Sequence, residues 1–262
     1  MAIFQNMAGK KLSDQLTLFV GNVMQIKIIP GKGELVPFRL TVAPANFMKL
    51  LEDHTRKTAN FEIYKLKAAA QGSGQFWANN DKGVKAGPIN VTVKQPLTLP
   101  TGNENQLALI KLLLAESPSP AYANYNIATF KTGMQWMRLV VENRLKMKSY
   151  LVGSEGATTL IDVIKARNQF EGFGSYPTIA KQQLENINNI LAIASDGTHP
   201  DQQRFYDHVS AAIAVVTKEA LIADPCPTKL LAWRTSGSGY PGGSFKYYKT
   251  FSGQDFYTIP KK

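Results

Sequence analysis

Glu116 is the residue whose type and position in the sequence best suit acid catalysis. It follows Leu112, Leu113 and Ala115 at the end of an apolar stretch with helical spacing. The carbonyl end of a helix carries negative partial charge, and an apolar wall desolvates a carboxylate, so both effects favour the protonated acid. A carboxyl that stays protonated near neutral pH can donate a proton to the leaving oxygen of a glycosidic bond. The alternative interpretation is a solvated glutamate at a helix end, followed by a proline-rich turn.

The loop that follows, residues 118–126, has a composition suited to binding sugars. Tyr122 and Tyr125 provide aromatic faces for stacking, and Asn124 and Asn126 provide amides that hydrogen-bond to hydroxyl groups. We therefore interpret Tyr122 and Tyr125 as candidate substrate-binding residues beside Glu116.

Metal chemistry has little support in the composition. The chain contains three histidines and one cysteine, so a structural zinc site of the usual kind would need almost all of them. His208 and Ser210 are two residues apart on a predicted helix and face different directions, which argues against a nucleophile pair. We expect no metal ion and no cofactor, and the single cysteine excludes a disulfide scaffold.

Residues 1–100 are expected to form a small, mainly β domain. Apolar and polar residues alternate with period two in several segments, and turn-forming clusters separate these segments. One helix is predicted over residues 44–54, because Phe47, Leu50 and His54 have helical spacing. The predicted strands are 17–29, 36–42, 61–66, 75–78 and 89–93.

After Pro96 and Pro100 the period changes to that of helices, which predicts a domain boundary near residue 100. Residues 101–262 are expected to form a mainly α domain, with a short strand near Trp233 and an aromatic tail. The expected fold class is therefore α+β, a mainly β N-terminal domain followed by a helical one. The first predicted helix begins at a capping box formed by Thr101 and Glu104 and ends near Glu116. The other predicted helices are 129–150, 158–166, 178–194 and 201–223.

Short motifs follow one another between residues 104 and 259. The first is Leu113 to Ser117, and the second is Gly133 followed ten residues later by Asn143 and Arg144. The third is Asp162 to Ile164, followed by Gln169 and Phe170. The closing segment contains Ala223 to Pro225, then Lys229 to Trp233, and then Phe251, Gly253, Phe256 and Tyr257. In this order they resemble the cell wall hydrolase family typified by spore cortex-lytic enzymes. The chain departs from that family at Ser117 to Pro120, where a Gly-Glu-Pro turn is frequent, and at Met134, where glutamine is common.

The resemblance implies a lysozyme-like helical domain that cuts the bond between N-acetylmuramic acid and N-acetylglucosamine in peptidoglycan. Glu116 takes the place of the family's catalytic glutamate. The Glu-Ser pair is also similar to the pair of lytic transglycosylases, in which the serine helps to hold the acid, so Ser117 becomes a second candidate catalytic residue.

Three further residues are candidates for substrate binding. Gln169 and Phe170 follow the third predicted helix and precede a glycine-rich segment, a position that suits the wall of a cleft. Tyr240 lies in a Gly/Ser-rich loop before the aromatic tail and could stack on a sugar. The alternative for each is a structural role in packing.

The mechanism depends on how many carboxylates lie near Glu116. Glu142, Glu155, Asp162 and Glu171 are the candidates for a second one, and surface ion pairs explain Glu142 and Asp162 equally well. A single acid suffices if Glu116 protonates the leaving oxygen and then removes a proton from the 6-hydroxyl of muramic acid, which closes a 1,6-anhydro ring. We therefore expect a lytic transglycosylase, with a hydrolytic muramidase as the close alternative.

The charge of the chain indicates an anionic partner. The net charge is +11, and residues 1–100 contain 13 Lys+Arg against 6 Asp+Glu. Nucleic acid, anionic lipid and bacterial cell wall all attract such a surface. The sequence contains no RNP-like, zinc-finger or helix-turn-helix pattern, so we do not expect a nucleic-acid partner. A nucleic-acid-binding protein whose affinity resides in residues 1–100 stays an alternative.

The route to the cell wall is a further inference from the sequence. We find no apolar run long enough for a membrane span and no cleavable export signal. We expect an antibacterial effector of a type VI-like secretion system, made in the cytoplasm and acting in the periplasm of a target bacterium, or else a phage lysin. An effector implies a cognate immunity protein and a secretion-apparatus component as partners. The alternative from another class is a non-catalytic glycan-binding component of a phage tail or secretion spike.

Overall fold

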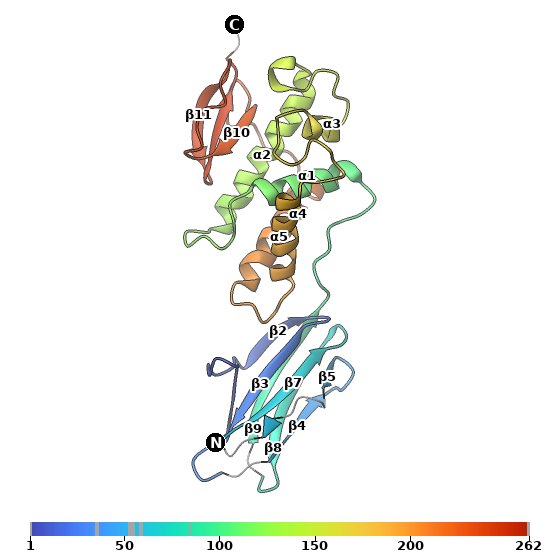
Figure 1. The fold of residues 1–262 in the computed structure, drawn as a ribbon, viewed down its shortest axis with the longest axis vertical. Coiled ribbons are helices and arrows are strands. Elements are labelled where there is room, and N and C mark those ends of the chain that lie inside the picture. Colours follow the sequence, from blue (N-terminus) through green and yellow to red (C-terminus); the bar gives the residue numbers. More distant parts are fainter. Residues whose placement is uncertain (1, 35–36, 52–55, 58–59, 84, 261–262) are drawn as a thin grey trace. The chain divides into compact units, whose positions relative to one another are not determined.

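The computed structural model describes residues 2–34, 37–51, 56–57, 60–83 and 85–260. The fold is α+β: β-sheets form the N-terminal part, helices the central part and a small sheet the C-terminal part (Figure 1). The chain divides into two compact units. Unit 1 comprises Met1–Pro96 and Ser195–Gln202, and unit 2 comprises Leu97–Ala194 and Gln203–Lys262.

Unit 1 consists of two β-sheets that bury one common core. The strand order is β1-β3-β7-β5 in the first sheet, where β6 also pairs with β7, and β2-β9-β8-β4 in the second. Ile26 and Leu66 of the first sheet lie in the same buried cluster as Phe76 and Val91 of the second. Alternate residues of β3 and of β8 enter this core, which explains the period-two pattern of these segments. The strands are β1 (Ile3–Gln5), β2 (Gln15–Phe19), β3 (Val23–Ile29), β4 (Phe38–Ala43), β5 (Met48–Leu50), β6 (Arg56–Lys57), β7 (Glu62–Ala68), β8 (Gly72–Asn80) and β9 (Lys85–Lys94).

The strands predicted at 36–42, 61–66, 75–78 and 89–93 correspond to β4, β7, β8 and β9, and Val36 lies outside the described residues. The segment 17–29 is not the single strand that its alternation predicts. It contains β2 and β3, which belong to different sheets and are separated by a turn at Gly21, whose φ is +95°. A left-handed φ of this kind favours glycine and allows the chain to pass from one sheet to the other.

The helix predicted over residues 44–54 is wrong. Met48–Leu50 form strand β5, which is antiparallel to β7 and obtains its backbone hydrogen bonds from that neighbour. Phe47 is buried whereas Leu50 is exposed, so their helical spacing does not mark one buried face. Pairing with a neighbouring strand therefore overrides the local pattern. His54, the last residue of the predicted helix, lies outside the described residues.

Unit 2 is built around helix α1 (Glu104–Glu116), which buries apolar side chains on most of its sides. It packs against α2, α3 and α4. A helix that is apolar almost all round belongs in the centre of a helical core, and this position brings its last residue, Glu116, close to buried surroundings. The five predicted helices are present, although their ends differ: α1 is capped by Asn103 and not by Thr101, and α5 is shorter than predicted. The other helices are α2 (Ile127–Met147), η2 (Tyr150–Val152), α3 (Leu160–Lys165), α4 (Lys181–Ala194) and α5 (Gln202–Thr217).

Helix α5 ends at Thr217, six residues earlier than the periodicity predicts. A guanidinium group from α2 occupies its end: Arg138 Nη1 donates to the carbonyl of Val215 and to the carbonyl of Glu219, the latter at 2.9 Å. These bonds satisfy carbonyl groups that have no partner within the helix. The side chain of Arg138 thus fixes where α5 stops.

The C-terminal sheet has the order β10-β12-β11, formed by Ala232–Thr235, Gln254–Thr258 and Lys246–Phe251. Its aromatic residues pack on α2, since the ring of Trp136 stacks on Phe251 at 4.6 Å and meets Phe256 edge to face at 5.1 Å. The aromatic tail therefore covers part of the core. None of the described helices is long and apolar enough to cross a membrane.

Candidate active site

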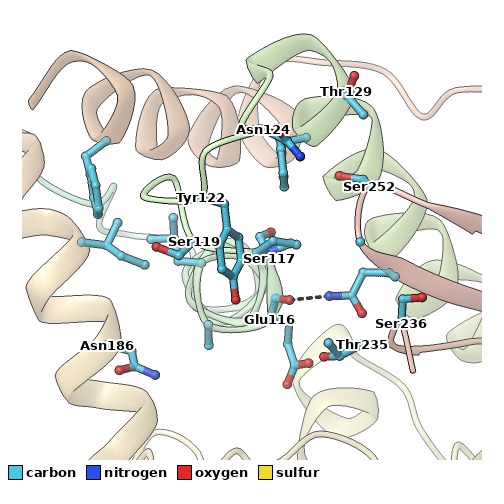
Figure 2. Close-up of a pocket in the computed structure, with 18 of the residues that line it drawn as sticks. Glu116, Ser117, Ser119, Tyr122, Asn124, Thr129, Asn186, Thr235, Ser236 and Ser252 are labelled. Atoms are coloured by element: carbon cyan, nitrogen blue, oxygen red, sulfur yellow. Dashed lines mark hydrogen bonds between the residues drawn. The ribbon is translucent and has the colours of Figure 1, made fainter. Parts of the chain in front are cut away.

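A cleft of about 980 Å³ lies within unit 2, at the C-terminal end of α1. The end of α1, the loop after it, α4 and the C-terminal sheet all contribute to its wall, and Glu116 is half-buried in that wall (Figure 2). Most of the polar groups are hydroxyls and amides. The polar lining residues are Glu116, Ser117, Ser119, Tyr122, Asn124, Thr129, Asn186, Asn189, Thr235, Ser236, Ser252 and Gln254.

Two residues of the C-terminal sheet hold Glu116 in place. The indole Nε1 of Trp233 donates to the Oε2 atom of Glu116 at 3.4 Å. The side-chain Nε2 of Gln254, which is buried, donates to the backbone carbonyl of Glu116 at 3.0 Å, the bond that is dashed in Figure 2. The second bond satisfies one of the carbonyls at the end of α1. The carboxyl is thus fixed both through its side chain and through its backbone.

Burial raises the pKa of Glu116 above its ordinary value, because desolvation disfavours the charged form. The hydrogen bond from Trp233 acts in the opposite direction, since it stabilises the carboxylate, and the negative charge of Glu171 raises the pKa further. The last turn of α1 contains no basic residue that would offset the negative end of the helix. The cleft therefore contains a carboxyl that retains its proton to a higher pH than an exposed glutamate.

These opposing contributions give a testable pair of substitutions. Trp233→Phe removes the hydrogen bond to the carboxylate, so we expect the pKa of Glu116 to rise. Glu171→Gln removes a neighbouring negative charge, so we expect the pKa to fall. Infrared or carbon NMR titration of the labelled carboxyl measures both shifts. Shifts in the same direction, or none, would contradict this account of the carboxyl's surroundings.

Ser117 caps the end of α1 and lines the cleft. Its backbone N–H donates to the carbonyl of Leu113 at 3.0 Å, and its buried hydroxyl lies 3.9 Å from the sulfur of Met137. The hydroxyl is thus directed toward a side chain of α2. This geometry fixes the turn that follows Glu116.

Tyr122 lines the cleft and is 61% exposed, as a residue that stacks on a ligand would be in the free protein. Tyr125 does not line it. The ring of Tyr125 stacks on Phe130 at 4.7 Å, and its hydroxyl lies 3.2 Å from Nδ1 of the buried His208. Tyr125 therefore supports the loop from behind, whereas Tyr122 faces the cleft (Figure 2).

Gln169 and Phe170 lie behind the cleft wall. Arg144 Nη1 donates to Gln169 Oε1 at 2.9 Å, and the guanidinium of Arg144 lies 5.1 Å from the centre of the Phe170 ring. The ring of Phe170 also packs on that of Trp233, at 5.1 Å between ring centres. A continuous series of contacts thus runs from Arg144 through Phe170 to Trp233 and Glu116.

Tyr240 also lies away from the cleft lining. Its ring packs edge to face on Tyr257 at 5.9 Å between ring centres, and its hydroxyl donates to the carbonyl of Phe245. Of the seven candidate residues named from the sequence, the structure brings Glu116, Ser117 and Tyr122 to one cleft. The other four, Tyr125, Gln169, Phe170 and Tyr240, are not among the residues that line it.

Several lining residues were missed by the sequence analysis. Asn186 and Asn189 are three residues apart on α4 and line the cleft, and Gln254 and Ser236 reach it from the C-terminal sheet and its loop. The spacing of the two asparagines on an amphipathic helix is a signal that could have been used, because residues three apart share one face. No local signal connects Gln254 with Glu116, which lies 138 residues away.

The other carboxylates that were candidates have separate roles. Asp162 forms a capping box with Thr159 at the start of α3, and the backbone hydrogen bonds there lower its pKa to about 2. Glu142 lies 3.9 Å from Nε of Arg138. Among the described residues that line the cleft, Glu116 is the single carboxylate, and Glu171 is an exposed residue that acts on it electrostatically.

Gly133 allows the C-terminal sheet to approach α2 closely. A Cβ atom at this position would lie 2.7 Å from both Cβ and Oγ of Ser252, which lines the cleft. We expect Gly133→Ala to destabilise the protein by about 1–2 kcal/mol, because a methyl group would be forced into a packed contact. Ser252 has a φ of +52°, which glycine adopts readily, so Ser252→Gly in the same chain should restore stability.

Urea denaturation of the wild type, the two single variants and the double variant measures this coupling. Equal stability of Gly133→Ala with and without Ser252→Gly would show that the contact is not the cause.

Comparison with known proteins gives distant structural similarities. No protein-family model matches the chain. No curated protein matches it either. Domains 4 and 5 of the S-layer protein SbsC are 15% identical over 31% of this chain and 47% of that chain, with a TM-score of 0.24. The SrpA adhesin of Streptococcus sanguinis is 10% identical over 40% of this chain and 67% of that chain, with a TM-score of 0.23. A titin and obscurin-like Ig complex is 18% identical over 32% of this chain and 89% of that chain, with a TM-score of 0.21.

The chain spans less than half the length of the S-layer chains that head these matches. TM-scores of this size support no conclusion about function, so the functional proposal depends on the cleft.

Proposed function

We propose that unit 2 is a lysozyme-like peptidoglycan-degrading domain of the cell wall hydrolase type and that the protein is a lytic transglycosylase. The observation that carries the proposal is a half-buried glutamate with a raised pKa, fixed by two residues and facing a cleft lined by amides and hydroxyls. Such a carboxyl is suited to protonating a glycosidic oxygen, and the amides and hydroxyls are suited to N-acetylated sugars.

In the proposed reaction Glu116 donates its proton to the oxygen that links N-acetylmuramic acid to N-acetylglucosamine. The bond between this oxygen and C1 of the muramic acid breaks, and the N-acetyl group of the substrate stabilises the cationic centre. The Glu116 carboxylate then removes the proton of the 6-hydroxyl, and O6 forms a bond to C1. The products are an anhydromuramic end and a free 4-hydroxyl, and Glu116 is protonated again.

A hydrolytic muramidase is the second candidate, and Glu171 is the observation that favours it. Its negative charge contributes to the raised pKa of Glu116. A second carboxylate could activate a water molecule in place of the 6-hydroxyl. Delivery as a secreted antibacterial effector, with a cognate immunity protein that covers the cleft, is part of the proposal and follows from the sequence alone.

Mass spectrometry of the fragments released from purified peptidoglycan distinguishes these functions. Anhydromuramic ends that appear with the wild type and not with Glu116→Gln would support the lytic transglycosylase. Reducing ends would indicate the muramidase. Binding to peptidoglycan without any released fragment would support a non-catalytic glycan-binding component instead.

A further inference from the structure

The loop between α1 and α2, residues 118–126, is attached to helix α5. Tyr122 and Asn124 of this loop line the cleft (Figure 2). Arg204 and His208 both contact the loop, and they are four residues apart on α5, so they lie on one face of that helix. All of these residues belong to unit 2. Arg204 and His208 together are called the α5 clamp here.

Arg204 holds the backbone of the residue that lines the cleft. Its Nη2 donates to the backbone carbonyl of Tyr122, and the same carbonyl accepts a hydrogen bond from the N–H of Tyr125 at 3.0 Å. A carbonyl oxygen has two lone pairs, so it can accept both bonds at once. The guanidinium also lies 5.3 Å from the centre of the Tyr125 ring, within the range of a cation–π contact. One side chain of α5 thus contacts both tyrosines of the loop.

His208 holds the same loop from inside the core. It is fully buried, its Nδ1 lies 3.2 Å from the hydroxyl of Tyr125, and its Nε2 has no hydrogen-bond partner among the residues that the structure describes. Burial lowers the pKa of His208 to about 4, so the imidazole is neutral at neutral pH. A buried nitrogen without a partner costs free energy that an apolar side chain would not cost. Local conflicts of this kind are frequent at functional sites.

The position of the Tyr122 ring depends on this attachment. The side chain is mostly exposed, so packing in the core does not fix it. The N–H of Tyr122 donates to the carbonyl of Ser119 at 3.2 Å, which shapes the loop locally without connecting it to α5. Phe205, next to Arg204 on α5, lines the cleft, so the clamp ties the loop to another part of the cleft wall. A ring that is already held in place loses less conformational entropy when a ligand stacks on it.

We propose that Arg204 and His208 are positioning residues, which hold the ring of Tyr122 where a sugar ring of the substrate stacks on it. They act through the loop and need no contact with the substrate. This inference rests on the proposed function, because the N-acetylated glycan it names is the proposed substrate.

A cycle of double substitutions tests the proposal. Isothermal titration calorimetry measures the affinity of the full-length Glu116→Gln protein for a soluble hexamer of N-acetylglucosamine, so binding is observed without cutting. Arg204→Met and His208→Leu are each introduced alone and together with Tyr122→Ala. The matched control is Arg167→Met, the same change at an exposed arginine of the same unit. Thermal unfolding verifies that each variant remains folded.

We expect Tyr122→Ala to weaken binding of the hexamer about fivefold to tenfold, because a stacked ring is lost. Each clamp substitution alone should weaken binding by about threefold to fivefold. In the Tyr122→Ala protein the same substitution should have less than about a twofold effect, since the ring that the clamp positions is gone. The control should bind like its parent.

A purely structural role of the clamp would give a different result. If the losses from a clamp substitution and from Tyr122→Ala multiply in the double variant, Arg204 and His208 do not act through Tyr122 and the proposal is overturned. Unchanged affinity of both single clamp variants would overturn it as well. So would a parent protein that does not bind the hexamer, because Tyr122 would then have no sugar to receive.

The failure of this inference is distinguishable from failure of the proposed function. If fragments with anhydromuramic ends are released from peptidoglycan and the losses in the cycle multiply, only the inference is lost. If no fragments are released and the losses do not multiply, the inference holds and the protein binds glycan without cutting it.

The kinetics of a protein that cuts give a second readout. With soluble peptidoglycan strands, Arg204→Met in the otherwise wild-type chain should raise KM by about threefold to fivefold and change kcat little. The reason is that Glu116 is held by Trp233 and Gln254, which the clamp does not contact through any of the bonds described above. A fall in kcat at unchanged KM would contradict an effect on binding through Tyr122.

Discussion

Glu116→Gln is expected to lower the rate of peptidoglycan cutting by about a thousandfold while the protein stays folded. The amide has the shape of the carboxyl but supplies no proton, and general acid catalysis of this kind contributes roughly 10²–10⁴-fold. Quantifying the fragments released per enzyme over time measures the loss. Glu104→Gln is the matched control, because Glu104 lies at the other end of the same helix. A Glu116→Gln variant that cuts at the wild-type rate would contradict the proposed function.

The same substitution should affect stability with a defined sign. The pKa of Glu116 is raised in the folded protein, so above that pKa the folded state holds a carboxylate that it disfavours. The resulting loss of stability is absent below the ordinary pKa of a glutamate and grows as the pH rises toward the raised value. Glu116→Gln should therefore increase the melting temperature at neutral pH and leave it unchanged at low pH. Lower stability of the variant at neutral pH would contradict the burial argument.

Arg144→Ala is expected to destabilise unit 2 by about 3 kcal/mol, because it leaves buried acceptors without a donor and empties a packed site. Arg144 is 4% exposed, and its Nε donates to the carbonyl of Leu231 at 2.6 Å while its Nη1 donates to Gln169. Burial lowers the pKa of the guanidinium to about 10, so the group stays charged at neutral pH. Urea denaturation measures the loss.

Arg167→Ala is the control for this second prediction, because Arg167 is an exposed arginine of the same unit. It should change the free energy of unfolding by less than about 0.5 kcal/mol. Arg144→Ala should also alter the pH dependence of cutting, since the contacts of Arg144 with Phe170 support the indole of Trp233. Equal effects of the two substitutions would show that the buried guanidinium is dispensable.

The helices of unit 2 could be predicted from the sequence because their apolar spacing and their packing agree. The helix predicted near Phe47 is wrong because Leu50, which has helical spacing from Phe47, is exposed and lies on a strand. The strand that pairs with it, β7, comes later in the chain. Spacing in a short segment does not reveal such a partner. The turn at Gly21, which separates β2 from β3, is hidden for the same reason, since both strands alternate in the same way.

The candidate site could be predicted in its local part. Glu116, Ser117 and Tyr122 lie within seven consecutive residues, so one segment carries them to the cleft. Gln169 and Phe170 were expected to contact a ligand, but Phe170 packs against both the ring of Trp233 and the guanidinium of Arg144, and neither residue lines the cleft. A side chain that touches a ligand and one that supports it have the same residue type and the same spacing, so only the tertiary structure separates them.

The order of the chain has a consequence for the cell that makes the protein. Trp233 and Gln254 lie 117 and 138 residues after Glu116, and ribosomes release the N-terminal part of a chain first. Until the last strands emerge, Glu116 lacks the hydrogen bonds from Trp233 and Gln254. Synthesis that stalls before residue 233, or proteolysis that removes the final strands, should therefore yield a chain in which Glu116 is not held in place, so the proposed activity would require complete translation.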